Sequence, residues 1–213
     1  TLRIAGATHA SGAAFDLGTV ALRTLEHFDV GLLATHADGC VQETTVTVTR
    51  SHYLRGTTVG GDNQADTVAV SGDGNRIALG DHVDGVRAQG INGTPMGGLY
   101  AVGAVFLFQR SGSTWQLEAT FREPTLVTQD YFGKSVALSY DGTTMVVGSD
   151  GRDVGPYDAG VAWVFQHNGS AWVQEASLTN PMPTAFDYVG RSISLSNDGN
   201  TLAVGGPQED SNA

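Results

Sequence analysis

The stretch Asp130-Tyr-Phe-Gly-Lys-Ser-Val-Ala-Leu-Ser-Tyr-Asp-Gly142 decides the fold, because it returns 57 residues later as Asp187-Tyr-Val-Gly-Arg-Ser-Ile-Ser-Leu-Ser-Asn-Asp-Gly199. The same offset relates further residues without a gap: Gly103 to Gly160, Phe108 to Phe165, Gly112 to Gly169, Trp115 to Trp172, Glu118 to Glu175 and Pro124 to Pro181. Periods of this size are typical of units that bury their apolar faces by stacking on neighbours. The repeat therefore predicts a scaffold of stacked units.

Each unit contains four short strand candidates joined by turn sequences. Asp-Gly in Tyr140-Asp-Gly142 predicts a tight hairpin with positive φ at both turn positions, and His167-Asn-Gly-Ser170 predicts another turn of that kind. Four strands and two tight turns in about 57 residues describe a propeller blade, so we expect an all-β fold. In the best-preserved copy the strand candidates are 135–139, 144–148, 160–165 and 172–178.

The apolar pattern distinguishes inner from outer strands. Residues 145–147 and 202–204 are continuous apolar runs, which predict inner strands covered on both faces by neighbouring sheets. Residues 172–178 alternate instead, which predicts a half-exposed outer strand with Trp172, Gln174, Ala176 and Leu178 on one face.

An earlier copy begins near Tyr53, but its Asp73 lies 68 residues before Asp141, so 11 residues are inserted between Gly80 and Gly103. The resulting polar, Gly-rich loop at 81–98 is expected on one rim, where binding varies most readily. A closed propeller needs about four to eight blades, so we expect an internal fragment of a longer protein. The predicted parts are a blade with a rim insertion at 53–123, a blade at 124–180 and an incomplete blade at 181–213.

Composition limits the partners. Acidic residues outnumber basic ones 22 to 11, the net charge is -11, and the basic residues are scattered. Nucleic acid and anionic membrane surfaces bind through clustered Lys and Arg, so neither is expected as a partner. Cys40 is the single cysteine, which rules out an internal disulfide. No apolar stretch approaches the roughly 20 residues of a membrane span, so no membrane insertion is expected in this segment.

Several of these residues carry a family resemblance. Phe132-Gly133, the following Lys-Ser-Val-Ala-Leu-Ser, Asp141-Gly142 and Met-Val-Val-Gly148 resemble the FG-GAP repeat of integrin-α-like β-propellers, in its bacterial type, over about residues 53 to 213. The resemblance implies protein interaction or adhesion outside the cell. Its calcium loop, Asp-x-Asp-x-Asp-Gly, is reduced here to single Asp-Gly turns at 72–74, 140–142 and 197–199, which offer too few oxygens for calcium. We therefore expect no metal or cofactor.

Residues 1–51 do not follow the repeat. Residues 29–39, and then 43–50 with alternating branched and polar side chains, resemble the last strands of a cadherin-like β-sandwich. We expect the C-terminal part of such a domain there.

No residue is predicted to be catalytic, cofactor-binding or metal-binding. The six histidines, at 9, 27, 36, 52, 82 and 167, show no zinc-type spacing, and Cys40 has no basic partner nearby in sequence. The acidic residues of loop 150–158, with Asp81, Asp84, Glu209 and Asp210, could gather around a cation but are expected to be solvated. Trp115, Trp163 and Trp172 could form a sugar-stacking face, although recurrence at a fixed offset favours packing.

Two functions are compatible with these sequence features. The first is a non-enzymatic, secreted or cell-surface propeller scaffold for adhesion or protein-protein interaction, whose ligand is a protein or a surface. The alternative is the non-catalytic part of a propeller-fold extracellular hydrolase or lyase. Both rest on analogy at the level of the fold.

Overall fold

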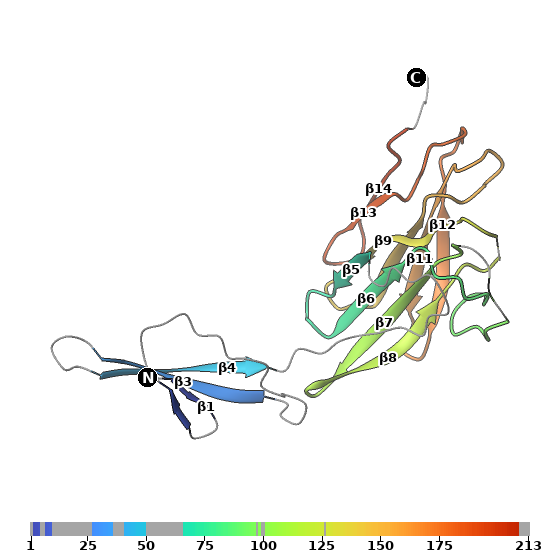
Figure 1. Cartoon of the computed structure of the whole chain (residues 1–213). Helices are drawn as coiled ribbons and strands as arrows, with labels where there is room; N and C mark the ends of the chain where they lie inside the picture. Colours follow the sequence, from blue (N-terminus) through green and yellow to red (C-terminus); the bar gives the residue numbers. More distant parts are fainter. Residues whose placement is uncertain are drawn as a thin grey trace. The chain divides into compact units, whose positions relative to one another are not determined.

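The computed structural model describes residues 66–96, 98, 101–125 and 127–208, together with the backbone of strands at 2–4, 7–9, 27–35 and 41–49. The chain divides into two compact units, Thr1–Tyr53 and Leu54–Ala213. Every regular element in the described residues is a β-strand (Figure 1). The predicted all-β class is therefore confirmed.

The described strands of the first unit form an antiparallel sheet in the order β2-β1-β3-β4. Its long hairpin pairs β3 with β4 from His27 opposite Thr49 to Thr35 opposite Val41. A sandwich needs a second sheet facing the first, so the cadherin-like assignment of 1–51 stays a prediction. The strands are β1 (Leu2–Ile4), β2 (Ala7–His9), β3 (His27–Thr35) and β4 (Val41–Thr49).

The second unit contains two four-stranded antiparallel sheets, in the orders β5-β6-β7-β8 and β12-β11-β10-β9, and a two-stranded sheet of β13 and β14 (Figure 1). We call the three sheets blades 1, 2 and 3. The strands are β5 (Thr67–Val70), β6 (Arg76–Asp81), β7 (Ala104–Ser111), β8 (Thr114–Phe121), β9 (Phe132–Leu138), β10 (Thr144–Ser149), β11 (Val161–His167), β12 (Trp172–Leu178), β13 (Ser192–Leu195) and β14 (Leu202–Gly205). The four predicted strands of blade 2 are present, and their ends differ from the prediction by at most three residues.

The Asp-Gly turns are wider than predicted. Gly142 has a φ of 67°, but Asp141 is not among the residues with positive φ, so the expectation of two left-handed positions was wrong. The Asp141 carboxylate accepts hydrogen bonds from Ser139 Oγ at 2.7 Å and from the Thr143 amide at 3.0 Å. These bonds hold the five-residue connection 139–143, in which only Gly142 is left-handed. In the turn after β11, likewise, Gly169 has positive φ and Asn168 does not.

Blade 2 packs one face against blade 1 through an aromatic core. The Phe121 ring lies 5.0 Å from Phe165 and 5.5 Å from Trp172, both edge to face. Met145 and Val147 of β10 are fully buried in the same cluster, as the continuous apolar run predicted. In blade 3 the corresponding run at 202–204 is only partly buried, so that half of the prediction was wrong.

A β-bulge interrupts the outer strand of each complete blade. The register shifts at Leu107/Phe108 of β7 and at Val164/Phe165 of β11 leave Glu118 and Glu175 unpaired in the ladder. These two glutamates are 57 residues apart. The bulge moves Ala176 and Leu178 to the sheet face opposite Trp172, so the predicted single alternating face was wrong.

Adjacent blades meet through main-chain contacts at the inner strands. The Thr67 hydroxyl donates to the Gly133 carbonyl at 2.9 Å, and the Ser135 hydroxyl donates to the Gly190 carbonyl at 2.6 Å. Gly103 also touches blade 2 at this junction: it has a φ of 88°, and a Cβ there would overlap the Phe132 carbonyl oxygen. The Phe-Gly motif at 132–133 is thus used to join blades.

Candidate interaction site on the loop face

Loops of successive blades gather at one end of the sheets. Because each sheet is an antiparallel meander, the β6–β7 and β10–β11 connections lie at the same end as the segments entering β9 and β13. We call this end the loop face. It carries an open cavity of about 440 Å³, the loop-face cavity, lined by His82, Val83, Tyr131, Lys134, Asp150, Asp158, Tyr188 and Arg191.

Four of these lining residues are repeat equivalents, since Tyr131 and Tyr188, and Lys134 and Arg191, are each 57 residues apart. The tyrosines have φ values of 56° and 53°, a left-handed conformation that costs a non-glycine residue about 1 to 2 kcal/mol. Their amides donate to carbonyls of the preceding blade, Ala101 at 3.4 Å and Asp158 at 3.0 Å. Docking of the blades thus places a tyrosine and a cation at each junction.

Basic and acidic side chains lie close together around this cavity. Lys134 Nζ lies 3.3 Å from His82 Nε2, and His82 Nδ1 lies 2.5 Å from Asp66 Oδ2. Arg191 Nη1 is 3.8 Å from Asp150 Oδ2, and the Arg191 guanidinium lies 5.5 Å from the centre of the Tyr188 ring. The Arg191 side chain is 51% exposed, so it is available to a ligand.

Asp150 is the acidic centre of the cavity. The residue is only 4% exposed, and burial raises its pKa although Lys134 and Arg191 act in the opposite direction. Its buried Oδ1 has no hydrogen-bond donor among the described residues. Burial, and then the charge of Asp153, also raise the pKa of Asp158. The cavity can therefore bind a polar group that brings a donor to Asp150 and an acceptor to the cations.

The expectation of solvated carboxylates was wrong for Asp81, Asp84 and Asp150, which are at most 4% exposed. Asp84 Oδ1 accepts from Arg122 Nη2 at 3.0 Å and from the Val86 amide at 2.8 Å. For Asp81 and Asp84 the reason is that the inserted segment, in which they lie, folds back onto blade 1.

That segment pairs with the end of β8. The Gly90 amide donates to the Glu123 carbonyl at 3.0 Å, and Ile91 forms a bridge with Phe121. The predicted rim loop is therefore partly an added edge of blade 1. The other two acidic candidates, Glu209 and Asp210, lie outside the described residues.

The remaining candidates are the tryptophans, the histidines and Cys40. Some of them pack in the core, and the others lie outside the residues that the structure describes. Trp163 and Trp172 are each 8% exposed inside the core, which confirms the packing interpretation for them, whereas Trp115 is half-buried against a cluster that includes Phe106 and Phe108. The His167 ring lies 5.4 Å from the ring of Trp172. The side chains of His9, His27, His36, His52 and Cys40 lie outside the described residues.

One acidic pair was not predicted from the sequence. Glu123 is fully buried, and burial followed by the neighbouring Asp130 raises its pKa to about 8. Trp163 Nε1 donates to Glu123 Oε1 at 3.2 Å, and Arg152 Nη1 donates to Asp130 Oδ2 at 2.8 Å. The repeat could have indicated this pair, because Asn180 and Asp187 are the equivalents of Glu123 and Asp130. In that copy Asn180 Nδ2 donates a hydrogen bond to Asp187 at 3.0 Å.

The turn aspartates serve their own turns. Asp73 accepts from Ser71 Oγ at 2.6 Å and Asp198 accepts from Ser196 Oγ at 2.5 Å, as Asp141 does from Ser139. These hydroxyl bonds lower the pKa of Asp73 and Asp198. In the described part of the chain, no three His, Cys, Asp or Glu side chains are grouped as a metal site would need. The expected absence of a metal stays a prediction.

Comparison with known proteins supports the repeat. Residues 115–165 match the family model of the FG-GAP repeat, from the beginning of β8 through most of β11. A search of curated proteins found no significant match. Among the described residues, no helix has the length and apolar character needed to cross a membrane. The chain thus carries an FG-GAP repeat within four-stranded blades of the propeller type; the integrin-like, bacterial and cadherin-like assignments stay predictions.

Proposed function

We propose that this chain is a non-enzymatic propeller scaffold, secreted or displayed at a cell surface, that binds a protein or surface ligand through its loop face. The matched repeat supports the interaction role, because FG-GAP repeats are typically found in extracellular interaction domains. The observation that carries the proposal is the loop-face cavity, where Tyr131, Lys134, Tyr188 and Arg191 recur with the repeat.

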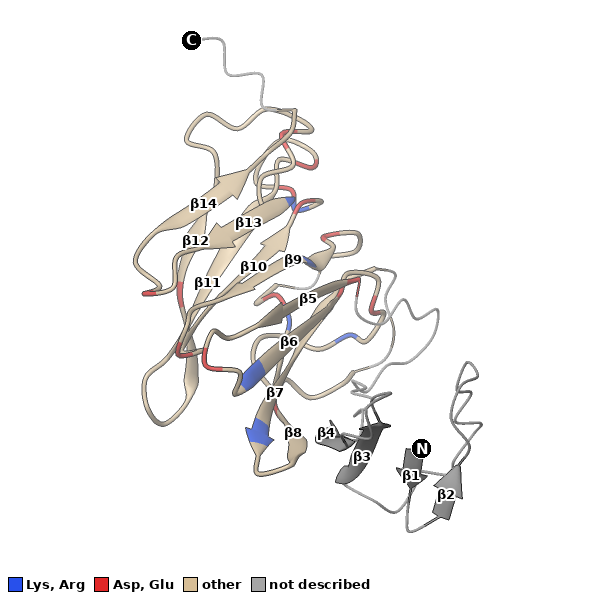
Figure 2. Cartoon of the chain, turned by 90° about the vertical axis from the view of Figure 1, so that its left-hand side faces the viewer, with Lys and Arg blue, Asp and Glu red and all other residues tan. Residues whose placement is uncertain are grey.

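The distribution of charge supports this choice of face. Arg76 is held by Glu118 through contacts of 2.8 and 3.0 Å, and Arg122 is held by Asp84, so both have structural partners. Most acidic residues of blades 2 and 3 lie in turns and loops (Figure 2). Charged side chains are therefore concentrated in the connections, where a rigid scaffold commonly carries its binding residues.

The test is adhesion of the chain, immobilised on beads, to intact cells and to a panel of extracellular-matrix proteins. Reversing both cations, with Lys134→Glu and Arg191→Glu, is expected to weaken adhesion at least about tenfold, as loss of a salt-sensitive charged contact does. Arg110→Glu is the matched control, since Arg110 is exposed beside the β7–β8 turn at the opposite end of blade 1.

Two results would contradict the proposal. Equal adhesion of the double variant and the control would remove the loop face from the interaction. Cleavage of a matrix protein or polysaccharide by the purified chain would favour the hydrolase or lyase alternative, and the panel is therefore assayed for cleavage products as well as for binding.

A further inference from the structure

The turn that joins β11 to β12 carries an asparagine followed by a glycine. Its sequence is His167-Asn-Gly-Ser170, and Asn168, Gly169 and Ser170 are exposed. The Asn168 amide donates to the Ala171 carbonyl at 3.0 Å, which closes the turn. Gly169 has a φ of 93°, and a Cβ there would meet open space. The peptide bond beside the asparagine is therefore open to solvent.

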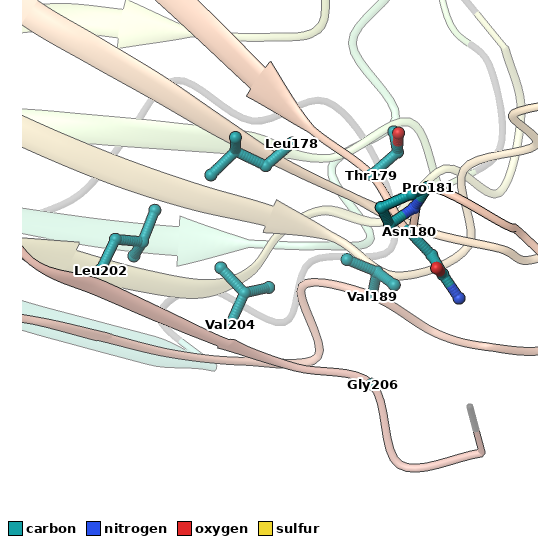
Figure 3. Close-up of a pocket in the computed structure, with 8 residues that line it drawn as sticks. All are labelled: Leu178, Thr179, Asn180, Pro181, Val189, Leu202, Val204 and Gly206. Carbon is teal, nitrogen blue, oxygen red and sulfur yellow. The ribbon is translucent and has the colours of Figure 1, made fainter. Parts of the chain in front are cut away.

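The exposure of this turn belongs to the complete blade. The equivalent turn of blade 1, at 110–114, is exposed although blade 2 packs beside blade 1. A groove of about 350 Å³ that Leu178 and Val204 help to line takes in the other end of β12 and does not include the turn (Figure 3). Water can therefore reach Asn168 in this fold.

An asparagine followed by a glycine can lose its side-chain amide through a cyclic imide. The Gly169 backbone nitrogen attacks Asn168 Cγ and closes a five-membered ring with the Cβ, Cα and carbonyl carbon of Asn168. For this step the Gly169 N–H must lose its proton, and Asn168 Oδ1 must carry negative charge in the tetrahedral intermediate. Glycine favours the step because it has no Cβ to obstruct the approach.

Contacts within the turn meet both requirements. The Gly169 amide donates to His167 Nδ1 at 3.3 Å, so the nitrogen that must be deprotonated already faces an imidazole acceptor. The amides of Ser170 and Ala171 each donate to Asn168 Oδ1 at 3.0 Å. Two amide donors at this distance stabilise negative charge that develops on an oxygen, as an oxyanion hole does.

His167 is held in position by its surroundings. It is the last residue of β11, and its amide donates to the Thr143 carbonyl at 2.8 Å. Its ring lies edge to face with the ring of Trp172, at 5.4 Å between centres. A base that is fixed in this way loses little freedom when it accepts a proton from its neighbour.

We propose that Asn168 is a site of self-catalysed deamidation, with His167 as the general base. His167 Nδ1 takes the proton of the Gly169 amide as the nitrogen bonds to Asn168 Cγ. The imidazolium then gives a proton to the side-chain nitrogen of Asn168, which leaves as ammonia. Water opens the resulting succinimide to aspartate or isoaspartate, so one water is consumed for each ammonia released. The change occurs once in each molecule and is independent of ligand binding at the loop face.

The aspartate product fits the turn. In the β9–β10 turn the Asp141 carboxylate accepts from the Thr143 amide at 3.0 Å, which is the contact that Asn168 makes with the Ser170 amide. A carboxylate at position 168 can keep both amide donors, and its hydrogen bonds are stronger because the acceptor is charged. The modification therefore adds negative charge to the tip of the hairpin while the blade keeps its fold.

The chain contains its own reference site for this reaction. Asn92-Gly93 is the second Asn-Gly pair of the sequence, and Asn92 is exposed as well. Asn92 Oδ1 accepts from the Thr120 amide at 2.9 Å, and a Cβ at Gly93 would overlap the Gln89 carbonyl oxygen. Among the described residues, the Gly93 amide has no imidazole acceptor. The same dipeptide therefore lacks the base at this second site.

The test follows both sites in the full 213-residue chain by peptide mapping with mass spectrometry during incubation at neutral pH. In the folded chain, Asn168 is expected to deamidate at least about tenfold faster than Asn92, because a positioned base assists proton transfer. In concentrated urea the contacts of the turn are lost, and the two rates are expected to lie within about threefold of each other. Chromatography separates the aspartate and isoaspartate products.

A chain variant tests the base. His167→Gln keeps a polar side chain but removes the proton acceptor, so the rate at Asn168 is expected to fall at least about fivefold while the rate at Asn92 stays unchanged. Glu175→Gln, at an exposed position of the same hairpin, is the matched control and leaves both rates unchanged. Near-UV circular dichroism verifies the fold of each variant. If His167→Gln does not fold, the comparison of the folded chain with the chain in urea still decides the matter.

Two outcomes would overturn the proposal. The first is a folded chain in which Asn168 deamidates no faster than Asn92, because the contacts of the turn would then give no assistance. The second is a folded His167→Gln variant that keeps the rate of the unmodified chain at Asn168, because the imidazole would then not take the proton.

Discussion

Replacing Glu123 with glutamine is expected to reduce the loss of stability that its raised pKa predicts between pH 5 and pH 8.5. Glu123 is fully buried beside Asp130, and its Oε2 has no hydrogen-bond donor among the described residues when the carboxyl is ionised. A proton on Glu123 supplies the missing donor toward Asp130. The amide of Asn180 does the same toward Asp187 one repeat later, so a glutamine is a natural replacement.

The size of the effect follows from the pKa of Glu123, which rises from 4.5 to about 8 on folding. Each pKa unit corresponds to about 1.4 kcal/mol, so the shift represents at most about 5 kcal/mol. The folded state holds the proton more tightly than the unfolded state. The stabilisation is therefore complete below pH 4.5 and is lost as the pH rises through about 8.

The assay is equilibrium urea denaturation at several pH values from 5 to 8.5. In this range the carboxylates with lowered pKa values, such as Glu118 and Asp141, are ionised in both states. Burial raises the pKa values of Asp150 and Asp158, but these residues are present in the unmodified chain and in the variant, so the difference between the two reports on Glu123. Between pH 5 and pH 8.5, the free energy of unfolding is expected to decrease less for Glu123→Gln than for the unmodified chain, by at least about 2 kcal/mol. Glu175→Gln, at an exposed bulge position, is the control and keeps the full pH dependence.

A Glu123→Gln variant that keeps the pH dependence of the unmodified chain would show that Glu123 is not protonated in the folded state. Destabilisation of the variant by more than about 2 kcal/mol at pH 5 would likewise contradict the prediction, because it would mean that the ionised carboxylate, paired with Arg152 at 3.6 Å, is the stabilising form.

Three further predictions concern packing and metal. In Gly160→Ala the new Cβ would overlap the Val189 carbonyl oxygen, so urea denaturation should show a destabilisation of more than about 2 kcal/mol. The control is Gly169→Ala, which should cost about 1 kcal/mol because a Cβ there meets open space. Similar costs for the two variants would argue against the contact. Trp172→Phe removes a 2.9 Å hydrogen bond to the half-buried Glu118 and should cost about 1 to 2 kcal/mol more than Trp115→Phe, and equal costs would contradict this. Calcium chelation should leave the thermal midpoint unchanged, because the turn aspartates are used within their turns; a drop of several degrees would reverse this prediction.

The 57-residue repeat predicted the blade architecture because it indicates both where the strands form and that successive units stack on one another. What it did not predict depends on contacts between blades. The bulge at Glu118 turns that carboxylate toward Trp172 Nε1 of the next blade, at 2.9 Å, and toward Arg76. Although burial alone would raise it, these two donors hold the pKa of Glu118 below its usual value. No single-strand pattern contains that information.

The candidate site was less predictable than the fold for a related reason. Asp81 and Asp84 resemble ordinary loop carboxylates because the sequence does not show that the inserted segment folds onto β8. The recurring Tyr131 and Lys134 were visible in the repeat, but their shared cavity arises only when loops of three blades converge. Glu123 could have been recognised by comparison with Asn180, since a carboxyl that replaces an amide donor must carry a proton.

Each junction between blades contains a hydrogen bond from a hydroxyl to a glycine carbonyl, at 2.9 Å in the first and at 2.6 Å in the second. Because the joint uses main-chain atoms and small side chains at the inner strands, the connecting loops can change in length and chemistry without altering the angle at which one unit meets the next. The 11-residue insertion after Gly80 is an instance of that freedom. A duplicated blade added at such a junction would pack against its neighbour through the same inner-strand contacts, while its loops could evolve to bind a different ligand.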